Sequence, residues 1–118
     1  MKKRKPHILS QKIEPCCATL VIKVDSDIQD FEGHFPDFAL LPGVTQIDWA
    51  LFYAKQFLNV SRPFVGMEVI KFQYPILPDA IVTLQLDWDV DKNKLQFAYT
   101  SDQATTHSTG KIKLGNKE

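Results

Sequence analysis

The sequence predicts an α+β protein in which an antiparallel β-sheet wraps around one long central helix. Three patterns indicate this class: one breaker-free apolar segment of helical length, several segments in which apolar and polar residues alternate, and turn-forming sequences between them. The chain has 118 residues, of which 44% are hydrophobic and 24% charged, as in an ordinary globular domain. We therefore expect a single domain over residues 1–118, with residues 1–10 forming a flexible basic arm.

The first predicted strand covers residues 18–24. Leu20, Ile22 and Val24 recur at every second position there, which predicts one buried face. Residues 25–42 combine acidic side chains with glycine and proline, so this segment is expected to be an irregular loop.

The predicted helix covers residues 43–58. No helix breaker follows its first residue, and ten of its sixteen positions are apolar. This exceeds the apolar stripe of a surface helix, so we expect protein around most of its circumference.

The second half of the chain returns to alternation with a period of two residues, which predicts antiparallel strands joined by short turns. Two prolines close to each other predict a rigid corner between the first two of these strands. The predicted elements are strand 69–74, corner 75–79, strand 82–90, turn 91–93, strand 95–99 and strand 105–114.

Charge and composition exclude several classes of protein. Four of the 14 basic residues lie at positions 2–5, which leaves ten basic against 14 acidic residues in the rest of the chain. A nucleic-acid-binding surface is therefore not expected. No segment has the pattern of a signal peptide or the length of a membrane span.

The two cysteines, Cys16 and Cys17, are adjacent and cannot form a framework of bridges between distant segments. This pattern fits a reducing, cytoplasmic setting. Together with His7 and His107 they show no metal-ligand spacing, so we expect no metal site.

The segment with the strongest chemical signal begins at His34. This histidine lies in the predicted loop between Gly33 and Pro36, which can fix the imidazole without burying it in a regular element. Histidine titrates near neutral pH, so His34 is a candidate general base.

The start of the predicted helix supplies two further groups. Pro42 and Gly43 open the helix, and the free backbone N–H groups of Gly43 and Val44, aided by the helix dipole, can stabilise a developing negative oxygen. Asp48 follows in the second turn between Ile47 and Trp49. A carboxylate among apolar neighbours is costly to keep charged, so we expect a readily protonated group that suits a general acid.

These three groups match the elimination of water from a 3-hydroxyacyl thioester. In this interpretation His34 removes the proton next to the thioester, Gly43 and Val44 hold the enolate-like oxygen, and Asp48 protonates the leaving hydroxyl. Such a reaction requires no metal or redox cofactor.

Residues 33–36 (GHFP) and 42–44 (PGV), together with Asp48, resemble the 3-hydroxyacyl-[acyl carrier protein] dehydratases of the FabZ and FabA type, which have the hotdog fold. Residues 41–50 (LPGVTQIDWA) look most like the ApeI-like branch, which is associated with aryl polyene lipids. The resemblance covers roughly residues 18–114.

This resemblance implies a dehydratase that forms trans-2-enoyl thioesters in fatty acid or aryl polyene-type lipid biosynthesis. It implies His34 and Asp48 as catalytic residues, and Phe35 and Pro42 beside the Gly43 and Val44 donors as substrate-binding residues. It also implies a homodimer in which His34 of one protomer meets Asp48 of the other.

The implied substrate is carried on the phosphopantetheine of acyl carrier protein, with no resident cofactor. Because the carrier is acidic, basic side chains are candidates for its docking surface. They are residues 2–5, Lys55, Arg62 and Lys71.

The chain departs from the family pattern at four positions. Asp37 and Ala39 stand where Gly and Pro are usual, and Asp79 stands where a Gly usually follows the corner proline. Phe52 replaces a common Gln on the helix, which predicts a drier pocket.

Two alternative functions remain open from the sequence. A hotdog thioesterase would use an acid to activate water and would not require His34. A catalytically silent subunit that binds acyl carrier protein would result if Phe52 and the other departures had closed the pocket.

Overall fold

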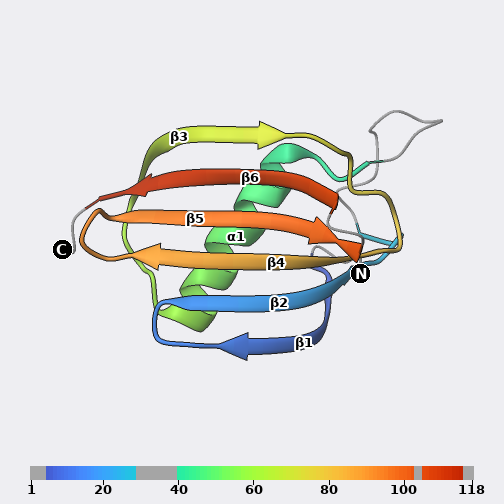
Figure 1. Ribbon diagram of the computed structural model, residues 1–118, viewed down its shortest axis with the longest axis horizontal. Coiled ribbons are helices and arrows are strands. Elements are labelled where there is room, and N and C mark those ends of the chain that lie inside the picture. Colours follow the sequence, from blue (N-terminus) through green and yellow to red (C-terminus); the bar gives the residue numbers. More distant parts are fainter. Residues whose placement is uncertain (1–4, 29–39, 103–104, 116–118) are drawn as a thin grey trace.

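The computed structural model describes residues 5–28, 40–102 and 105–115. In these residues one antiparallel sheet of six strands covers one side of a single α-helix (Figure 1), which confirms the predicted α+β architecture. The strand order is β1-β2-β4-β5-β6-β3. The elements are β1 (His7–Ile13), β2 (Cys17–Val24), α1 (Gly43–Leu58), β3 (Phe64–Phe72), β4 (Ala80–Asp89), β5 (Lys94–Ser101) and β6 (Thr105–Leu114).

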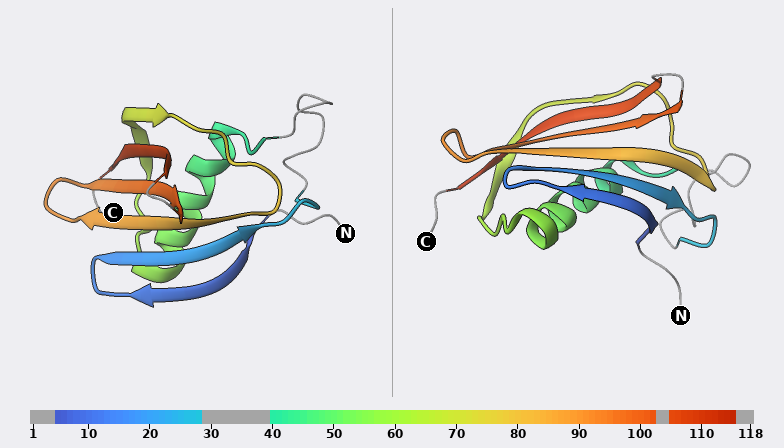
Figure 2. Two further views of the ribbon diagram at one scale, coloured as in Figure 1. Left: turned by 45° about the vertical axis from the view of Figure 1, so that its right-hand side comes forward. Right: turned by 60° about the horizontal axis from the view of Figure 1, so that its bottom comes forward.

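The core lies between the helix and the concave face of the sheet. Figure 2 shows the strands curving over α1, which packs against β2 and β4. Leu20 and Ile22 on β2 and Leu84 on β4 are fully buried, while the residues between them face the other side. The alternation that predicted the strands is therefore the pattern of core contact. No helix in the described residues is long and apolar enough to span a membrane.

The helix is covered on one side only, which corrects the expectation that protein surrounds it. Its outward face presents Val44, Asp48 and Phe52 to solvent, because the sheet reaches only one side of the helix. The surplus apolar residues of this segment therefore form an open surface in the single chain. The buried stripe consists of Thr45, Gln46, Trp49, Ala50, Tyr53, Ala54 and Leu58.

The predicted basic arm over residues 1–10 is too long. His7–Ile13 form edge strand β1, which pairs with β2 and has an irregularity between Ile8 and Ser10. Most side chains of this strand are exposed, so the segment lacks the alternation that marks a half-buried strand. Backbone pairing, which leaves no signature in the side chains, holds β1 to the sheet.

Strand β3 forms the opposite edge and begins five residues earlier than the predicted strand at 69–74. Its only partner among the described residues is β6, and its ladder is irregular near Gly66 and Met67. Most of its side chains are exposed, including Phe64, Val65 and Met67. Because the strand is exposed and irregular, its first half showed no period of two.

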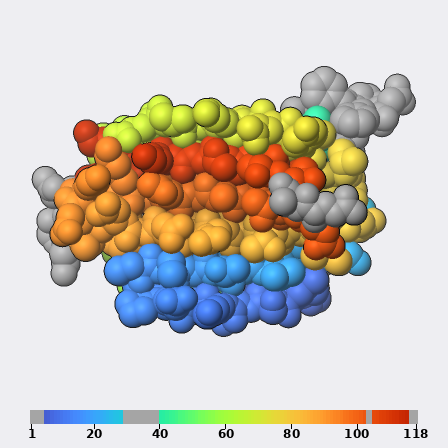
Figure 3. All heavy atoms as spheres, in the orientation of Figure 1, coloured from blue at the N-terminus to red at the C-terminus, as the bar shows by residue number. Residues whose placement is uncertain are grey.

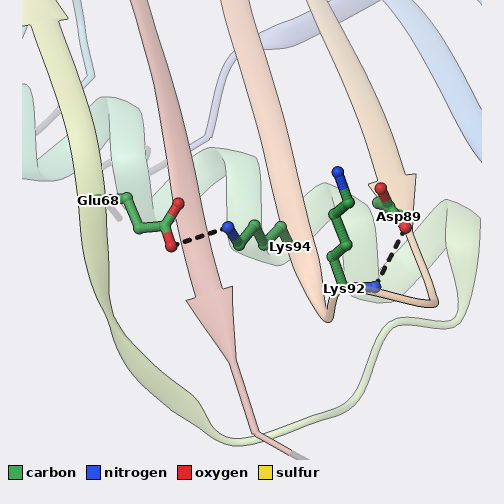
Figure 4. A network of polar contacts seen from close by, with 4 residues as sticks. All are labelled: Glu68, Asp89, Lys92 and Lys94. Atoms are coloured by element: carbon green, nitrogen blue, oxygen red, sulfur yellow. Dashed lines mark hydrogen bonds and ion pairs between the residues drawn. The ribbon is translucent and has the colours of Figure 1, made fainter.

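The convex face of the sheet carries polar side chains. Figure 3 shows the strands as neighbouring bands on this face. A carboxylate oxygen of Glu68 on β3 lies 2.9 Å from Nζ of Lys94 on β5, so this ion pair passes over β6 (Figure 4). The hydrogen bond from Lys94 lowers the pKa of Glu68. At the adjacent turn, the backbone N–H of Lys92 donates to Asp89 at 3.2 Å.

Asp79 adopts the left-handed conformation at the corner between β3 and β4, with φ of 67°. This is the backbone region that glycine enters most easily and that Asp tolerates better than most residues. Its carboxylate also accepts a hydrogen bond of 3.1 Å from the backbone N–H of Ser26. The departure from the family glycine is thereby accommodated.

Candidate active site

The first turn of α1 has open backbone donors. Pro42 occupies the N-cap position and supplies no capping side chain. The N–H groups of Thr45 and Gln46 donate to the carbonyl of Pro42 at 3.1 and 3.2 Å. Within the described residues, the N–H groups of Gly43 and Val44 donate to no acceptor. These are the two donors that the sequence analysis assigned to an oxyanion.

The space beside Gly43 is filled by an aromatic ring. A Cβ atom built on Gly43 would lie 2.6 Å from Cζ of Phe72 at the end of β3. The absence of a side chain therefore admits the Phe72 ring to the first helical residue. In the single chain, the Phe72 ring makes the close approach that a glycine at this position permits.

A hollow of about 370 Å³ lies next to this glycine. It joins the start of the helix to the end of β3 and to the corner that follows. The wall of this hollow therefore combines the apolar ring of Phe72, backbone atoms and the buried amide of Gln46. The lining residues are Leu40, Leu41, Gly43, Gln46, Phe72, Gln73, Tyr74 and Pro75.

Asp48 lies on the outward side of the same helix. It is exposed, although Trp49 beside it is buried and Ile47 is half-buried. Consecutive residues on a helix point about 100° apart, so apolar sequence neighbours do not bury a side chain. The expected burial of Asp48 is therefore wrong for the single chain.

The surroundings of Asp48 are nevertheless apolar. The carboxylate borders a hollow of about 210 Å³ between the helix and the first half of β3. Val44, one turn before Asp48, is 75% exposed, and Phe52, one turn after it, is also exposed. Nζ of Lys5 lies 4.6 Å from the centre of the Phe52 ring. The other residues of the hollow are Ile47, Leu51, Phe64 and Met67.

Gln46 is a site residue that the sequence analysis missed. Its side chain is buried, and its Nε2 donates to the carbonyl of Leu41 at 3.1 Å. Its Oε1 accepts a hydrogen bond of 2.6 Å from the hydroxyl of Ser108 on β6. The N–H of Leu41 in turn donates to the carbonyl of Ile76 at 2.8 Å. The residue before the N-cap is thus held on both sides.

Tyr99 on β5 adds a second anchor to this turn. Its hydroxyl donates to the backbone carbonyl of Gln46 at 2.7 Å. Burial raises the pKa of Tyr99 well above its ordinary value, and the charges of Tyr53 and Asp48 raise it further. The phenol therefore stays protonated as a donor at physiological pH.

Several residues singled out in the sequence lie elsewhere. His34 and Phe35, with the departures Asp37 and Ala39, are outside the described residues. Of the candidate docking residues in the described part, Lys5 lies over the Phe52 ring, and Lys55 and Arg62 border a hollow near the end of the helix. Lys71 lines a separate hollow on the surface of the sheet.

The described residues contain no group of three His, Cys, Asp or Glu side chains that could hold a metal ion. Cys16 and Cys17 are both free thiols. Desolvation raises the pKa of Cys17, and the nearby charge of Glu14 raises it further.

A long helix held against one six-stranded antiparallel sheet defines a protein of the hotdog fold. The Escherichia coli PaaI protein from the phenylacetic acid degradation operon shares this fold, with a TM-score of 0.63 over 91% of this chain and 79% of that chain. At 16% identity this likeness concerns the fold alone.

Closer similarity identifies the family. The family described as ApeI-like, ApeI dehydratase, matches residues 10–111. The chain therefore belongs to the ApeI-like dehydratase family. It is 39% identical to a chain of the dehydratase heterocomplex ApeI:P from Xenorhabdus doucetiae, with a TM-score of 0.88 over 95% of this chain and 99% of that one.

Two further relatives extend this similarity. An uncharacterised protein from Erwinia carotovora subsp. atroseptica is 39% identical, with a TM-score of 0.84 over 94% of this chain and 96% of that chain. The 3-hydroxyacyl-[acyl-carrier-protein] dehydratase FabZ from Clostridium perfringens strain SM101 is 29% identical over an alignment of 119 positions, which covers 92% of this chain and 83% of the relative.

Proposed function

We propose that this protein is a hydro-lyase that converts a carrier-bound 3-hydroxyacyl thioester to the trans-2-enoyl thioester, in fatty acid or aryl polyene-type lipid biosynthesis. The observation that carries the proposal is a pair of N–H donors at the start of α1 that have no acceptor among the described residues. They lie in the helix segment that also holds Asp48.

In the proposed reaction His34 removes the proton from the carbon next to the thioester carbonyl. The N–H groups of Gly43 and Val44 stabilise the negative charge that develops on the thioester oxygen. Asp48 donates a proton to the hydroxyl on the next carbon, and the C–O bond breaks. The products are a carbon–carbon double bond and one water molecule.

We further propose that two copies of the chain complete each site. A general acid must be protonated when it acts, yet Asp48 is exposed in the single chain. A second copy that covers Val44, Met67 and the exposed edge of β3 would remove water from the carboxyl and favour its protonated form. The heterocomplex from Xenorhabdus doucetiae supports an oligomeric arrangement.

The assay incubates the protein with a 3-hydroxyacyl thioester and, separately, with its trans-2-enoyl partner, each bound to acyl carrier protein. Absorbance of the conjugated double bond and release of free thiol are followed together. Interconversion without thiol release is the expected result. Thiol release indicates a thioesterase, and binding of the carrier without either change indicates a silent subunit.

His34→Ala and Asp48→Asn are each expected to abolish turnover without unfolding the protein. Mixing the two inactive variants tests whether the site is shared between protomers. In a mixed dimer one site carries both changes and the other carries neither, so random exchange restores roughly a quarter of the parental rate. No recovery after verified exchange would show that both groups of a site come from one chain.

The proposed interface is tested by Met67→Lys, which places a charge on the apolar surface beside Asp48. Sedimentation is expected to show a shift from dimer to monomer, with loss of turnover. Ile81→Lys is the matched control, because Ile81 on β4 is 54% exposed and Met67 is 52% exposed. A parent chain that is monomeric and inactive alone would instead indicate a different chain as the second component.

A further inference from the structure

We infer that Gln46, anchored by Ser108, is a positioning residue that fixes the start of α1 while leaving its N–H donors open for the substrate. The inference rests on the proposed function and assigns it a residue that does not itself touch the substrate. It arises from a buried polar network that connects the helix start to the middle of the sheet.

The helix start lacks the usual device that holds a first turn. A Ser, Thr, Asp or Asn at the N-cap accepts a hydrogen bond from the second or third N–H of the helix. Here the N-cap is Pro42, so no side chain performs this role. In this helix the second N–H belongs to Val44, which the proposed reaction assigns to the thioester oxygen. A capping side chain would compete with the substrate for that donor.

Gln46 holds the turn from the other direction. Its side chain reaches back five residues and donates to the carbonyl of Leu41, which precedes the N-cap. This bond uses an acceptor outside the helix and consumes none of its N–H donors. The ring of Pro42 fixes the backbone between Leu41 and Gly43, with φ of −59°. The peptide that leads into Gly43 is therefore held at both ends.

The orientation of the Gln46 amide follows from its partners. A backbone carbonyl can only accept a hydrogen bond, so the group that faces Leu41 must be the Nε2 donor. The remaining Oε1 then accepts from the hydroxyl of Ser108. Gln46 is 4% exposed and Ser108 is fully buried, so water does not replace either bond.

Ser108 connects the Gln46 amide to the Phe72 ring and to the Tyr99 hydroxyl. In the sheet it pairs with Phe72 on β3, whose ring lies over Gly43. On its other side it pairs with Tyr99 on β5, whose hydroxyl binds the backbone carbonyl of Gln46. One residue of β6 thus places the amide, the ring and the phenol in register with the first turn of α1.

The first test compares kcat and KM of Gln46→Leu and Ser108→Ala with those of the parent protein. Loss of either bond frees the helix start, so kcat is expected to fall roughly tenfold to a hundredfold, whereas KM changes less than about threefold. Gln96→Leu and Thr109→Ala likewise remove an amide and a hydroxyl, but on the other face of the sheet, and are expected to retain the parental kcat.

The second test uses Gln46→Glu, which keeps the acceptor for Ser108. A carboxylate cannot donate to the carbonyl of Leu41, but a protonated carboxyl can. The rate of this variant relative to the parent is therefore expected to rise at least about fivefold as the pH falls from about 8 to about 6. Dividing by the parental rate at each pH removes the pH dependence that the two proteins share.

If Gln46 has a merely structural role, its substitution lowers stability, but the relative rate of Gln46→Glu does not depend on pH. The inference is overturned if the relative rate of Gln46→Glu is independent of pH, or if Gln46→Leu and Ser108→Ala both retain the parental kcat. If Gln46→Leu does not fold, Ser108→Ala and Gln46→Glu decide the question.

A failure of the proposed function is recognised separately, because the parent protein itself would then turn over no thioester. In that case amide hydrogen exchange of Thr45 and Gln46 is compared in Ser108→Ala and Thr109→Ala. Faster exchange in Ser108→Ala alone supports the positioning role, and equal exchange overturns it.

Discussion

The ring of Phe72 occupies the space beside Gly43 in which any other residue would carry its Cβ atom. Gly43→Ala is therefore expected to push this ring aside. Phe72 is 52% exposed and its ring can move, so the free energy of unfolding changes by less than about 1 kcal/mol. The added methyl group and the displaced ring crowd the N–H donors, and kcat is expected to fall roughly tenfold.

Phe72→Ala combined with Gly43→Ala separates these two causes. If the displaced ring blocks the donors, the double variant regains most of the lost rate. A double variant as slow as Gly43→Ala would assign the whole effect to the methyl group.

Pro42→Ser is expected to raise the stability of the protein and to lower its activity. The new hydroxyl can cap the first turn by accepting from the N–H of Val44 or Thr45, which stabilises a helix by about 1 kcal/mol. The same bond competes with the thioester oxygen, so kcat falls while the midpoint of urea unfolding rises. Pro42→Ala, which lacks the hydroxyl, is the control. An equal loss of kcat in both variants would contradict competition for the donor.

Gly110 on β6 differs from Gly43, because the side chains beside it cannot move aside as the Phe72 ring can. A Cβ atom there would lie 2.6 Å from Cε2 of Phe97, which belongs to the buried core, and would also meet Ile70, which is partly buried and packs against that core. Gly110→Ala is therefore expected to lower the free energy of unfolding by about 1–3 kcal/mol. Gly66→Ala is the matched control, because nothing lies within 4 Å of its added methyl group. Equal unfolding midpoints for the two variants would contradict this packing.

The buried phenols predict that stability falls at alkaline pH. Burial raises the pKa of Tyr53 to about 12, and the pKa of Tyr99 is raised as well. An unfolded tyrosine loses its proton near pH 10, so the folded state binds more protons above that pH. The stabilisation is complete below about pH 10 and is lost as the pH rises toward 12.

Tyr53→Phe is expected to make the slope of unfolding free energy against pH less steep in this range, by the amount that corresponds to about one bound proton. Denaturant titrations at a series of alkaline pH values measure the slope. Tyr74→Phe is the control, since Tyr74 is 61% exposed. A parental slope in Tyr53→Phe would show that another group causes the alkaline loss.

The elements with strong local signals could be predicted from the sequence. The predicted helix at 43–58 and the last strand at 105–114 match α1 and β6. The helix segment is apolar and free of breakers over its length, and the strand segment ends in an alternation of lysine with Ile112 and Leu114. The edge strand β1 and the first half of β3 could not be predicted in this way. Their side chains are mostly exposed, so backbone pairing rather than side-chain burial determines their position.

The candidate site was predictable only in its local part. The proline–glycine pair indicated the N–H donors of Gly43 and Val44, which have no acceptor within the part of the chain that the structure describes. The exposure of Asp48 depends on where the sheet ends, and this cannot be predicted from the residues that surround Asp48 in the sequence. The bond between Gln46 and Ser108 joins residues 62 positions apart, so it emerges only when β6 lies beside the helix.

The sheet order also sets a sequence of events during synthesis. Strand β3 leaves the ribosome before β4, yet within the described residues it pairs only with β6, the last of the described strands in chain order. The nascent chain must therefore carry the apolar segment Phe64–Phe72 without its hydrogen-bonding partner until β6 has also been made. Chains that stop before β6 expose this segment permanently and become substrates for chaperones or aggregation.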